Sequence, residues 1–279
     1  MIPSAIVSPE WLRDRLEDPG LVVVDCRFEL SKPDAGRKAY ELDHIPGAVY
    51  MDLEKDLSGP VGRHGGRHPL PETEAFAEML GRAGIDHDKT VVAYDDQGGA
   101  MAARLWWLLR YFGHGQVAVL DGGYRGWKEK GFPVTADRIQ PRPVRFVPRI
   151  RHPEWLVSME EVKRHRGLLI DSREPDRYAG KFEPIDAKAG HIPGAINYFW
   201  KNNLEEGHSW KSPQALKRDF SFIPEGEEPI VYCGSGVTAC ANLLALYVAG
   251  RNGRLYAGSF SDWISYEENP VAQEEENSP

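Results

Sequence analysis

Cys233 opens the run Cys-Gly-Ser-Gly-Val-Thr (233–238), which lies between a short apolar stretch and a longer one with helical spacing. Residues 229–232 are expected to form a strand that delivers this cysteine into a loop, and the loop runs into a helix. Consecutive backbone N–H groups in such a loop can point inward as an anion-binding nest. The helix start adds unpaired N–H groups and a positive dipole end. Both effects favour thiolate over thiol, so we predict that Cys233 is a reactive nucleophile.

Composition narrows the classes of function. The chain has 279 residues, of which 41% are hydrophobic, so it can form one large domain or two domains of about 130 residues. Its formal charge of −8 makes nucleic acid or an anionic membrane a poor partner. No apolar stretch approaches the length of a membrane-spanning helix. The first residues lack the pattern of a signal peptide, so a cytoplasmic protein is expected.

The remaining two cysteines do not suggest a disulfide or a metal site. Cys26, Cys233 and Cys240 are too few for a disulfide scaffold, and none has the spacing of a zinc site. We expect Cys26 and Cys240 to be structural. The sequence therefore predicts no metal and no cofactor.

The sequence contains two copies of one pattern. His44-Ile-Pro-Gly-Ala48 recurs as His191-Ile-Pro-Gly-Ala195. Three further pairs of segments match in the same order, namely 22–27 with 168–173, 91–95 with 229–233, and 121–127 with 257–263. A repeat this long indicates two copies of one domain rather than a solenoid.

The join between the copies is rich in proline and basic residues without helical spacing, which is typical of an extended linker. We expect an N-terminal, non-catalytic domain over residues 1–137, a linker over 138–155 and a C-terminal, catalytic domain over 156–279. The acidic end of the chain, 267–279, is expected to be frayed.

Within each copy, short runs of Val, Ile and Leu alternate with amphipathic stretches. Strands are expected at 21–25, 90–94, 117–120, 168–171, 229–232 and 254–257. Helices are expected at 73–83, 100–112, 123–130, 158–166, 213–219 and 237–249. This alternation predicts an α/β fold in which a mainly parallel sheet is flanked by helices on both faces. Ligands of such folds bind at the carboxyl ends of the strands, where Cys233 is expected.

The two copies differ at the position of the nucleophile. The first copy carries Asp95 where the second carries Cys233. A carboxylate is no nucleophile for sulfur, so only one of the two equivalent loops is equipped for this chemistry.

These motifs together resemble the tandem rhodanese-type sulfurtransferases, the family of thiosulfate and 3-mercaptopyruvate sulfurtransferases. The cysteine loop, the repeated His-Ile-Pro-Gly-Ala, and the runs 105–114 and 119–123 carry the resemblance over nearly the whole chain. It implies two tandem rhodanese-like domains and a two-step reaction. Cys233 would take a sulfane sulfur from a donor as a persulfide, and cyanide, a thiol or reduced thioredoxin would remove it.

The resemblance leaves two donors open. Relatives that use thiosulfate typically carry basic residues after the cysteine, where this chain has Gly234 and Ser235. The neutral loop resembles the 3-mercaptopyruvate branch, in which a hydroxyl assists the reaction, and this gives Ser235 a catalytic role. That branch commonly has a second arginine where Ile185 or Asp186 stands here. Lys188 would replace it only as a point charge.

The resemblance also implies the binding residues. Arg177 matches the arginine that binds donor anions, and substrate contacts are expected from Lys188 and from the loop residues Gly234, Gly236, Val237 and Thr238. His44 and Asp34 resemble a proton-handling pair, and Trp200 could rim the cleft. Each has a structural alternative: Arg177 a surface salt bridge, Thr238 a helix cap, Trp200 simple packing. His44 recurs as His191, which favours a structural histidine.

Two other classes of function use a similar loop or domain. A cysteine-dependent phosphatase ends a similar loop with arginine, but this chain has Ala239 there. A silent rhodanese-like binding or regulatory module is the alternative reading, against which the intact Cys233 loop argues. A monomer is expected, because tandem domains can bury their interface within one chain.

Overall fold

The computed structural model describes residues 2–206 and 208–273, so positions 274–279 of the predicted frayed tail lie outside it. The chain folds into two compact units. The first comprises Met1–Gly59, Leu70–Pro153 and Leu204–Ser212. The second comprises Pro60–Pro69, Glu154–Asn203 and Pro213–Pro279. Each unit therefore includes a short segment that the predicted boundaries assign to the other.

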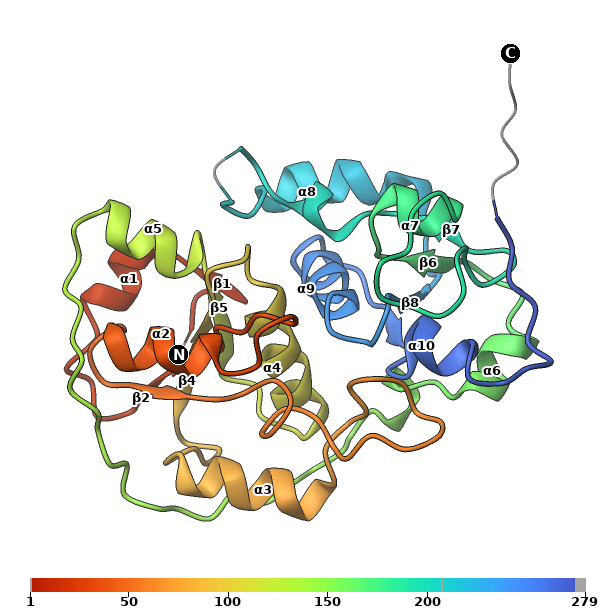
Figure 1. Ribbon diagram of the computed structural model, residues 1–279. Helices are drawn as coiled ribbons and strands as arrows, with labels where there is room; N and C mark the ends of the chain where they lie inside the picture. The colour runs from red at the N-terminus through yellow and green to blue at the C-terminus, as the bar shows by residue number, and fades with distance from the viewer. Residues whose placement is uncertain (1, 207, 274–279) are drawn as a thin grey trace. The chain divides into compact units, whose positions relative to one another are not determined.

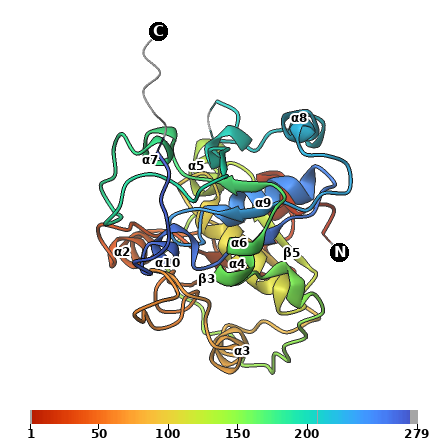
Figure 2. The same cartoon turned by 90° about the vertical axis from the view of Figure 1, so that its right-hand side faces the viewer.

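The first unit is built on a five-stranded sheet with the order β1-β5-β4-β2-β3, in which all neighbours are parallel. Its strands are β1 (Ile6–Val7), β2 (Leu21–Asp25), β3 (Ala48–Tyr50), β4 (Thr90–Tyr94) and β5 (Val117–Leu120). Its helices are α1 (Pro9–Arg13), α2 (Ala35–Leu42), α3 (Thr73–Arg82), α4 (Ala100–Tyr111) and α5 (Gly123–Glu129). In both views α3 and α5 lie on opposite sides of the strands (Figures 1 and 2).

The second unit repeats this plan with four parallel strands in the order β7-β6-β8-β9. The strands are β6 (Leu169–Asp171), β7 (Ile196–Asn197), β8 (Ile230–Tyr232) and β9 (Arg254–Leu255). The helices are α6 (Met159–Arg164), α7 (Pro175–Ala179), α8 (Pro213–Asp219), α9 (Ala239–Val248) and α10 (Ser259–Trp263). Short 3₁₀ turns are η1 (Pro153–Trp155), η2 (Trp200–Asn203) and η3 (Phe220–Phe222).

The predicted α/β class is confirmed, and each predicted strand and helix overlaps an observed one. The apolar strands fill buried layers: Ile230 and Tyr232 pack with Phe260 in the second unit. The helix predicted at 158–166 ends at Arg164 and begins with a capping box between Ser158 and Glu161. Most elements that the sequence did not indicate are short, for example β7 with two residues, but α2 with eight residues was also not predicted. Residues 138–152 form neither helix nor strand.

The segment Pro60–Pro69 docks on α10. The Gly65 N–H donates to Asp262 Oδ1 at 2.7 Å. His64 Nδ1 lies 2.7 Å from Ser265 Oγ, and its ring stacks on Tyr266 with centroids 4.0 Å apart. These contacts hold the end of the segment, with Arg67 and His68, within the second unit.

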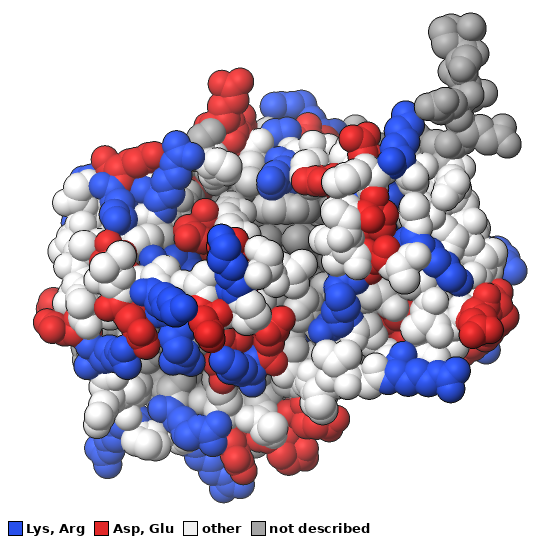
Figure 3. All heavy atoms as spheres, in the orientation of Figure 1, with Lys and Arg blue, Asp and Glu red and all other residues white. Residues whose placement is uncertain are grey.

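The surface carries no single dominant charge on the face drawn in Figure 3, where acidic and basic side chains are intermixed. None of the helices in the described part of the chain is long and apolar enough to cross a membrane.

Candidate active site

The Cys233 loop follows β8 directly and is held in place by α10. The Cys233 N–H donates to Ser259 Oγ at 3.1 Å, and the Cys233 carbonyl accepts the Phe260 N–H at 3.0 Å. The Gly236 N–H donates to Cys233 Sγ at 3.1 Å, so a loop amide points at the sulfur. Gly236 has φ +77°, and a Cβ there would lie 2.2 Å from the carbonyl oxygen of Ala257, which explains why the loop needs glycine at this position.

The matching loop of the first unit shows how many amides such a loop can direct at one anion. The buried Asp95 carboxylate accepts four backbone N–H groups at 2.8–3.0 Å, from Gln97, Gly99, Met101 and Ala102. Burial raises the pKa of Asp95, while these four hydrogen bonds oppose the rise. The first unit thus fills its own nest with a carboxylate, whereas the second places a thiol there.

A histidine that the sequence reasoning missed contacts the predicted hydroxyl. His68 Nδ1 lies 2.7 Å from Ser235 Oγ, and both side chains are buried. Such a pair can move a proton within the loop that holds Cys233. His68 lies in the Gly-, Arg- and His-rich segment Pro60–Pro69, whose composition indicates only a loop. Its position beside the second sequence copy comes from the docking of this segment on α10.

His44 and Asp34, the pair suggested by resemblance, lie in the first unit. His44 is fully buried, with Nδ1 2.6 Å from the carbonyl oxygen of Tyr40 and Nε2 3.2 Å from that of Asp137. Its repeat partner His191 makes the same contact with the carbonyl of Tyr178, at 2.8 Å. Asp34 is exposed at the start of α2. These contacts account for His44 structurally.

Arg177, on α7, is fixed by two buried carboxylates. Its Nε lies 2.9 Å from Glu183 Oε2, and its Nη2 lies 2.7 Å from Asp186 Oδ2. Burial opposes the ionisation of Glu183, but Arg177 and two backbone amides outweigh it and lower the pKa of this carboxyl. Burial also raises the pKa of Asp186, which the neighbouring arginines oppose.

A second guanidinium lies at the same place. Arg67 also pairs with Asp186, through Nη1 and Oδ1. A Cβ built on Gly234 would lie 2.8 Å from Arg67 Nη2 and 3.6 Å from Arg177 Nη2. Both guanidinium groups therefore border the residue that follows Cys233. The loop is neutral in sequence but is flanked by cations in space.

Known proteins with this arrangement identify the family. The model described as "Rhodanese-like domain" matches residues 8–130 and 152–266. The chain belongs to the rhodanese-type sulfurtransferases. It is 42% identical over 283 residues to the "Probable 3-mercaptopyruvate sulfurtransferase" of Pseudomonas aeruginosa, covering 98% of this chain and 99% of that protein. It is 34% identical over 277 residues to the thiosulfate sulfurtransferase of Rattus norvegicus, covering 93% and 92%.

A solved structure agrees. SseA from Escherichia coli, described as a 3-mercaptopyruvate sulfotransferase, is 32% identical and superposes with a TM-score of 0.81 over 92% of this chain and 99% of that one. The predicted family and the predicted enzyme class are confirmed.

The other candidate residues of this rhodanese-type protein have varied surroundings. Val237 is buried within the loop. Thr238 is the N-cap residue of α9, yet its side chain makes no capping hydrogen bond. Trp200 is buried in η2, and its carbonyl accepts a hydrogen bond from Asn203. Lys188 is half-buried and makes no ion pair within residues 2–206 and 208–273. Arg67, rather than Lys188, is the cation that pairs with Asp186 in addition to Arg177.

The other two cysteines are buried away from solvent. Burial, and then the charge of Asp25, raise the pKa of Cys26 well above its ordinary value. Cys240 is fully buried in α9, and its Sγ donates to the carbonyl of Gly236 at 3.3 Å. Neither environment favours a thiolate.

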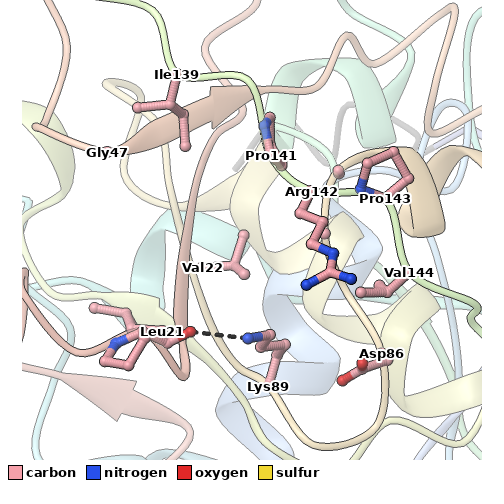
Figure 4. Close-up of a pocket in the computed structure, with 13 residues that line it drawn as sticks. Leu21, Val22, Gly47, Asp86, Lys89, Ile139, Pro141, Arg142, Pro143 and Val144 are labelled. Carbon is pink, nitrogen blue, oxygen red and sulfur yellow. Dashed lines mark hydrogen bonds between the residues drawn. The ribbon is translucent and has the colours of Figure 1, made fainter.

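The first unit also contains a pocket of about 550 Å³, which Lys89, Arg142 and Asp86 help to line (Figure 4). Lys89 Nζ donates to the carbonyl of Pro19 at 2.8 Å there. Lys89 precedes β4 and Leu21 begins β2, so the pocket lies at the amino ends of these strands. It is therefore not the counterpart of the Cys233 site, which lies at a carboxyl end.

Proposed function

We propose that this protein transfers a sulfane sulfur from 3-mercaptopyruvate, through a persulfide on Cys233, to cyanide or a thiol. The observation that carries the choice of donor is the 2.7 Å contact between Ser235 Oγ and His68 Nδ1, in the loop that holds Cys233. A thiol donor needs such a proton-transferring pair, whereas thiosulfate does not.

In the first step, the Cys233 thiolate attacks the sulfur of 3-mercaptopyruvate. A sulfur–sulfur bond forms, the carbon–sulfur bond breaks, and its electron pair passes to the departing pyruvate enolate. The proton of the donor thiol moves through Ser235 and His68 to the enolate carbon, which yields pyruvate and the Cys233 persulfide. General acid–base catalysis of this kind contributes about 10²- to 10⁴-fold to a rate.

The persulfide anion is then held in the loop, where the Gly236 N–H faces Sγ. In the second step cyanide attacks the outer sulfur, the sulfur–sulfur bond breaks, and its electron pair returns to Cys233 as thiolate. Thiocyanate leaves. A small thiol or reduced thioredoxin would accept the sulfur in the same way.

Thiosulfate is the competing donor, and it is the one named for the rat relative. Its leaving group is sulfite, a stable anion that requires no proton. The reaction with thiosulfate would therefore not need proton transfer by Ser235 and His68. The likeness to the probable 3-mercaptopyruvate sulfurtransferase of Pseudomonas aeruginosa supports the same choice.

The experiment treats the purified protein with each donor in turn and follows intact mass, peptide mass and thiocyanate formation with cyanide. The expected result is one added sulfur, on the Cys233 peptide, with faster turnover of 3-mercaptopyruvate than of thiosulfate. Cys233→Ser should remove both signals, while Cys26 and Cys240 stay unmodified. A wild-type protein with a free Cys233 thiol that gains no sulfur from either donor would overturn the proposed function. Faster turnover of thiosulfate would overturn the choice of donor.

A further inference from the structure

Arg67 stands where a side chain at position 234 would otherwise lie. A Cβ on Gly234 would meet Arg67 Nη2 at 2.8 Å, so a basic residue at 234 would require the Arg67 guanidinium to move. One of the two cations that border the Cys233 loop thus comes from the segment Pro60–Pro69. Arg67 Nε is buried and has no hydrogen-bond partner within the described residues, so this guanidinium is not saturated by the protein.

Asp186 lies between Arg67 and Arg177. One carboxylate oxygen pairs with Arg67 and the other lies 2.7 Å from Arg177 Nη2. The Asp186 side chain is only 1% exposed, compared with 29% for Arg67 and 12% for Arg177. The protein therefore places an anion of its own between the two cations that border the loop.

The charges of the whole cluster balance. Arg173 Nη2 lies 2.7 Å from Asp171 Oδ2, and Arg173 Nη1 lies 3.3 Å from Glu183 Oε2. Together with Arg67, Arg177 and Asp186, these residues give three guanidinium groups and three carboxylates. An anionic donor thus meets directed N–H donors without a net positive charge. Within residues 2–206 and 208–273, Asp186 is the one carboxylate that both Arg67 and Arg177 contact.

We propose that Asp186 is a specificity-determining residue of the donor site: by neutralising Arg67 and Arg177 beside Gly234, it favours a singly charged donor over a doubly charged one. This proposal rests on the proposed function, since it concerns the donor pocket of the same Cys233. 3-Mercaptopyruvate carries one negative charge and thiosulfate carries two.

The expected change in donor preference follows from Coulomb's law, in which the interaction energy depends on the product of the two charges. Coulomb energy scales with the charge of each partner, so removing the Asp186 charge helps a dianion twice as much as a monoanion at the same distance. If a monoanion gains about tenfold in affinity, a dianion gains about a hundredfold, and the preference shifts by about tenfold. Removing the positive charge of Arg67 should shift the preference in the opposite direction, toward the monoanion.

The test uses anions that cannot donate sulfur, so that it does not depend on turnover. Sulfate, a dianion, and pyruvate, a monoanion, are titrated as protectants of Cys233 against iodoacetamide at constant ionic strength, with the modified peptide quantified by mass. The variants are Asp186→Asn, Arg67→Gln and the double variant. Asp176→Asn is the matched control, because Asp176 is an exposed acid on the same helix as Arg177.

Asp186→Asn should raise the ratio of sulfate to pyruvate affinity about tenfold, and Arg67→Gln should lower it about tenfold. The double variant should return close to the wild-type ratio, as should Asp176→Asn. The same order should appear in the kcat/KM ratio of thiosulfate to 3-mercaptopyruvate. If Asp186→Asn does not fold, the test rests on Arg67→Gln. This variant is expected to fold because the Arg67 side chain is partly exposed.

The proposal is overturned if the ratio does not move, or if Asp186→Asn and Arg67→Gln move it in the same direction. Failure of the proposed function has a different signature: no persulfide forms on wild-type Cys233, while the sulfate-to-pyruvate ratio can still respond to Asp186→Asn.

Discussion

Asp95 and Cys233 occupy matching positions, each directly after a central parallel strand, but they use their loops differently. The Asp95 carboxylate accepts four backbone N–H groups, whereas the Cys233 sulfur accepts the N–H of Gly236. One loop is closed around an anion that belongs to the chain. The other presents the same kind of backbone to a reactive sulfur.

Asp95→Asn should destabilise the protein without removing the chemistry at Cys233. The amide nitrogen of asparagine cannot accept the two N–H groups that now bind one carboxylate oxygen, and each unpaired buried donor costs about 1–3 kcal/mol. Chemical denaturation should show a lower free energy of unfolding, and persulfide formation should persist. The neighbouring, exposed Asp96→Asn is the control, with a change within about 0.5 kcal/mol. Equal stability of the two variants would contradict the structural role of Asp95.

Two alanine substitutions in the Cys233 loop should behave in opposite ways. Gly236→Ala forces a side chain onto φ +77° and against the backbone oxygen of Ala257, which should cost at least about 2 kcal/mol and lower the thermal midpoint. Gly234→Ala meets only the end of the flexible Arg67 side chain, so it should cost less than about 1 kcal/mol.

The milder substitution, Gly234→Ala, should nevertheless affect donor binding. Gly234→Ala displaces Arg67 and should raise the donor KM while the fold survives. A folded Gly236→Ala protein with wild-type thermal stability would show that the close approach to Ala257 can be relieved.

His68→Gln should slow the step that needs a proton. With 3-mercaptopyruvate, we expect kcat to fall about 10²-fold or more, while the rate with thiosulfate falls less than about tenfold. Ser235→Ala should give the same split between donors. Arg63→Gln is the matched control, because Arg63 lies in the same segment and is exposed. Equal losses with both donors would indicate that His68 positions the loop without handling the proton.

Much of the fold was predictable because apolar runs and their spacing determine it locally. The alternation of strands and helices, the repeat and the position of Cys233 after a strand all follow from residues close in sequence. Most elements that were not predicted are short, such as β7 and α10 with two and five residues. So few residues show no recognisable period, and pairing or packing with distant segments stabilises them.

The site was only half predictable for the same reason. Cys233, Ser235 and Arg177 lie in motifs, and the structure places Ser235 and Arg177 around the Cys233 loop. His68 and Arg67 lie in a polar loop of the first sequence copy, and only its docking on α10 reveals their neighbours. The family resemblance drew attention to His44, whereas its recurrence as His191 favoured a structural role, and both histidines make the same contact with a tyrosine carbonyl. The sequence indicated that Ile185 or Asp186 stands where relatives carry a second arginine. The contact of Asp186 with Arg67 was not predictable, because it joins positions far apart in sequence.

The docking of Pro60–Pro69 on α10 has a consequence for the evolution of the second copy as a separate domain. A recombination event that moved the second copy alone into another gene would transfer Cys233 but leave behind the codons for His68, its proposed proton partner, and for Arg67, one of the two arginines that border its loop. Cys233 and the residues proposed to assist it are inherited together only when both copies stay in one reading frame. A lone second copy would have to recruit replacements for His68 and Arg67 before it could act in the same way.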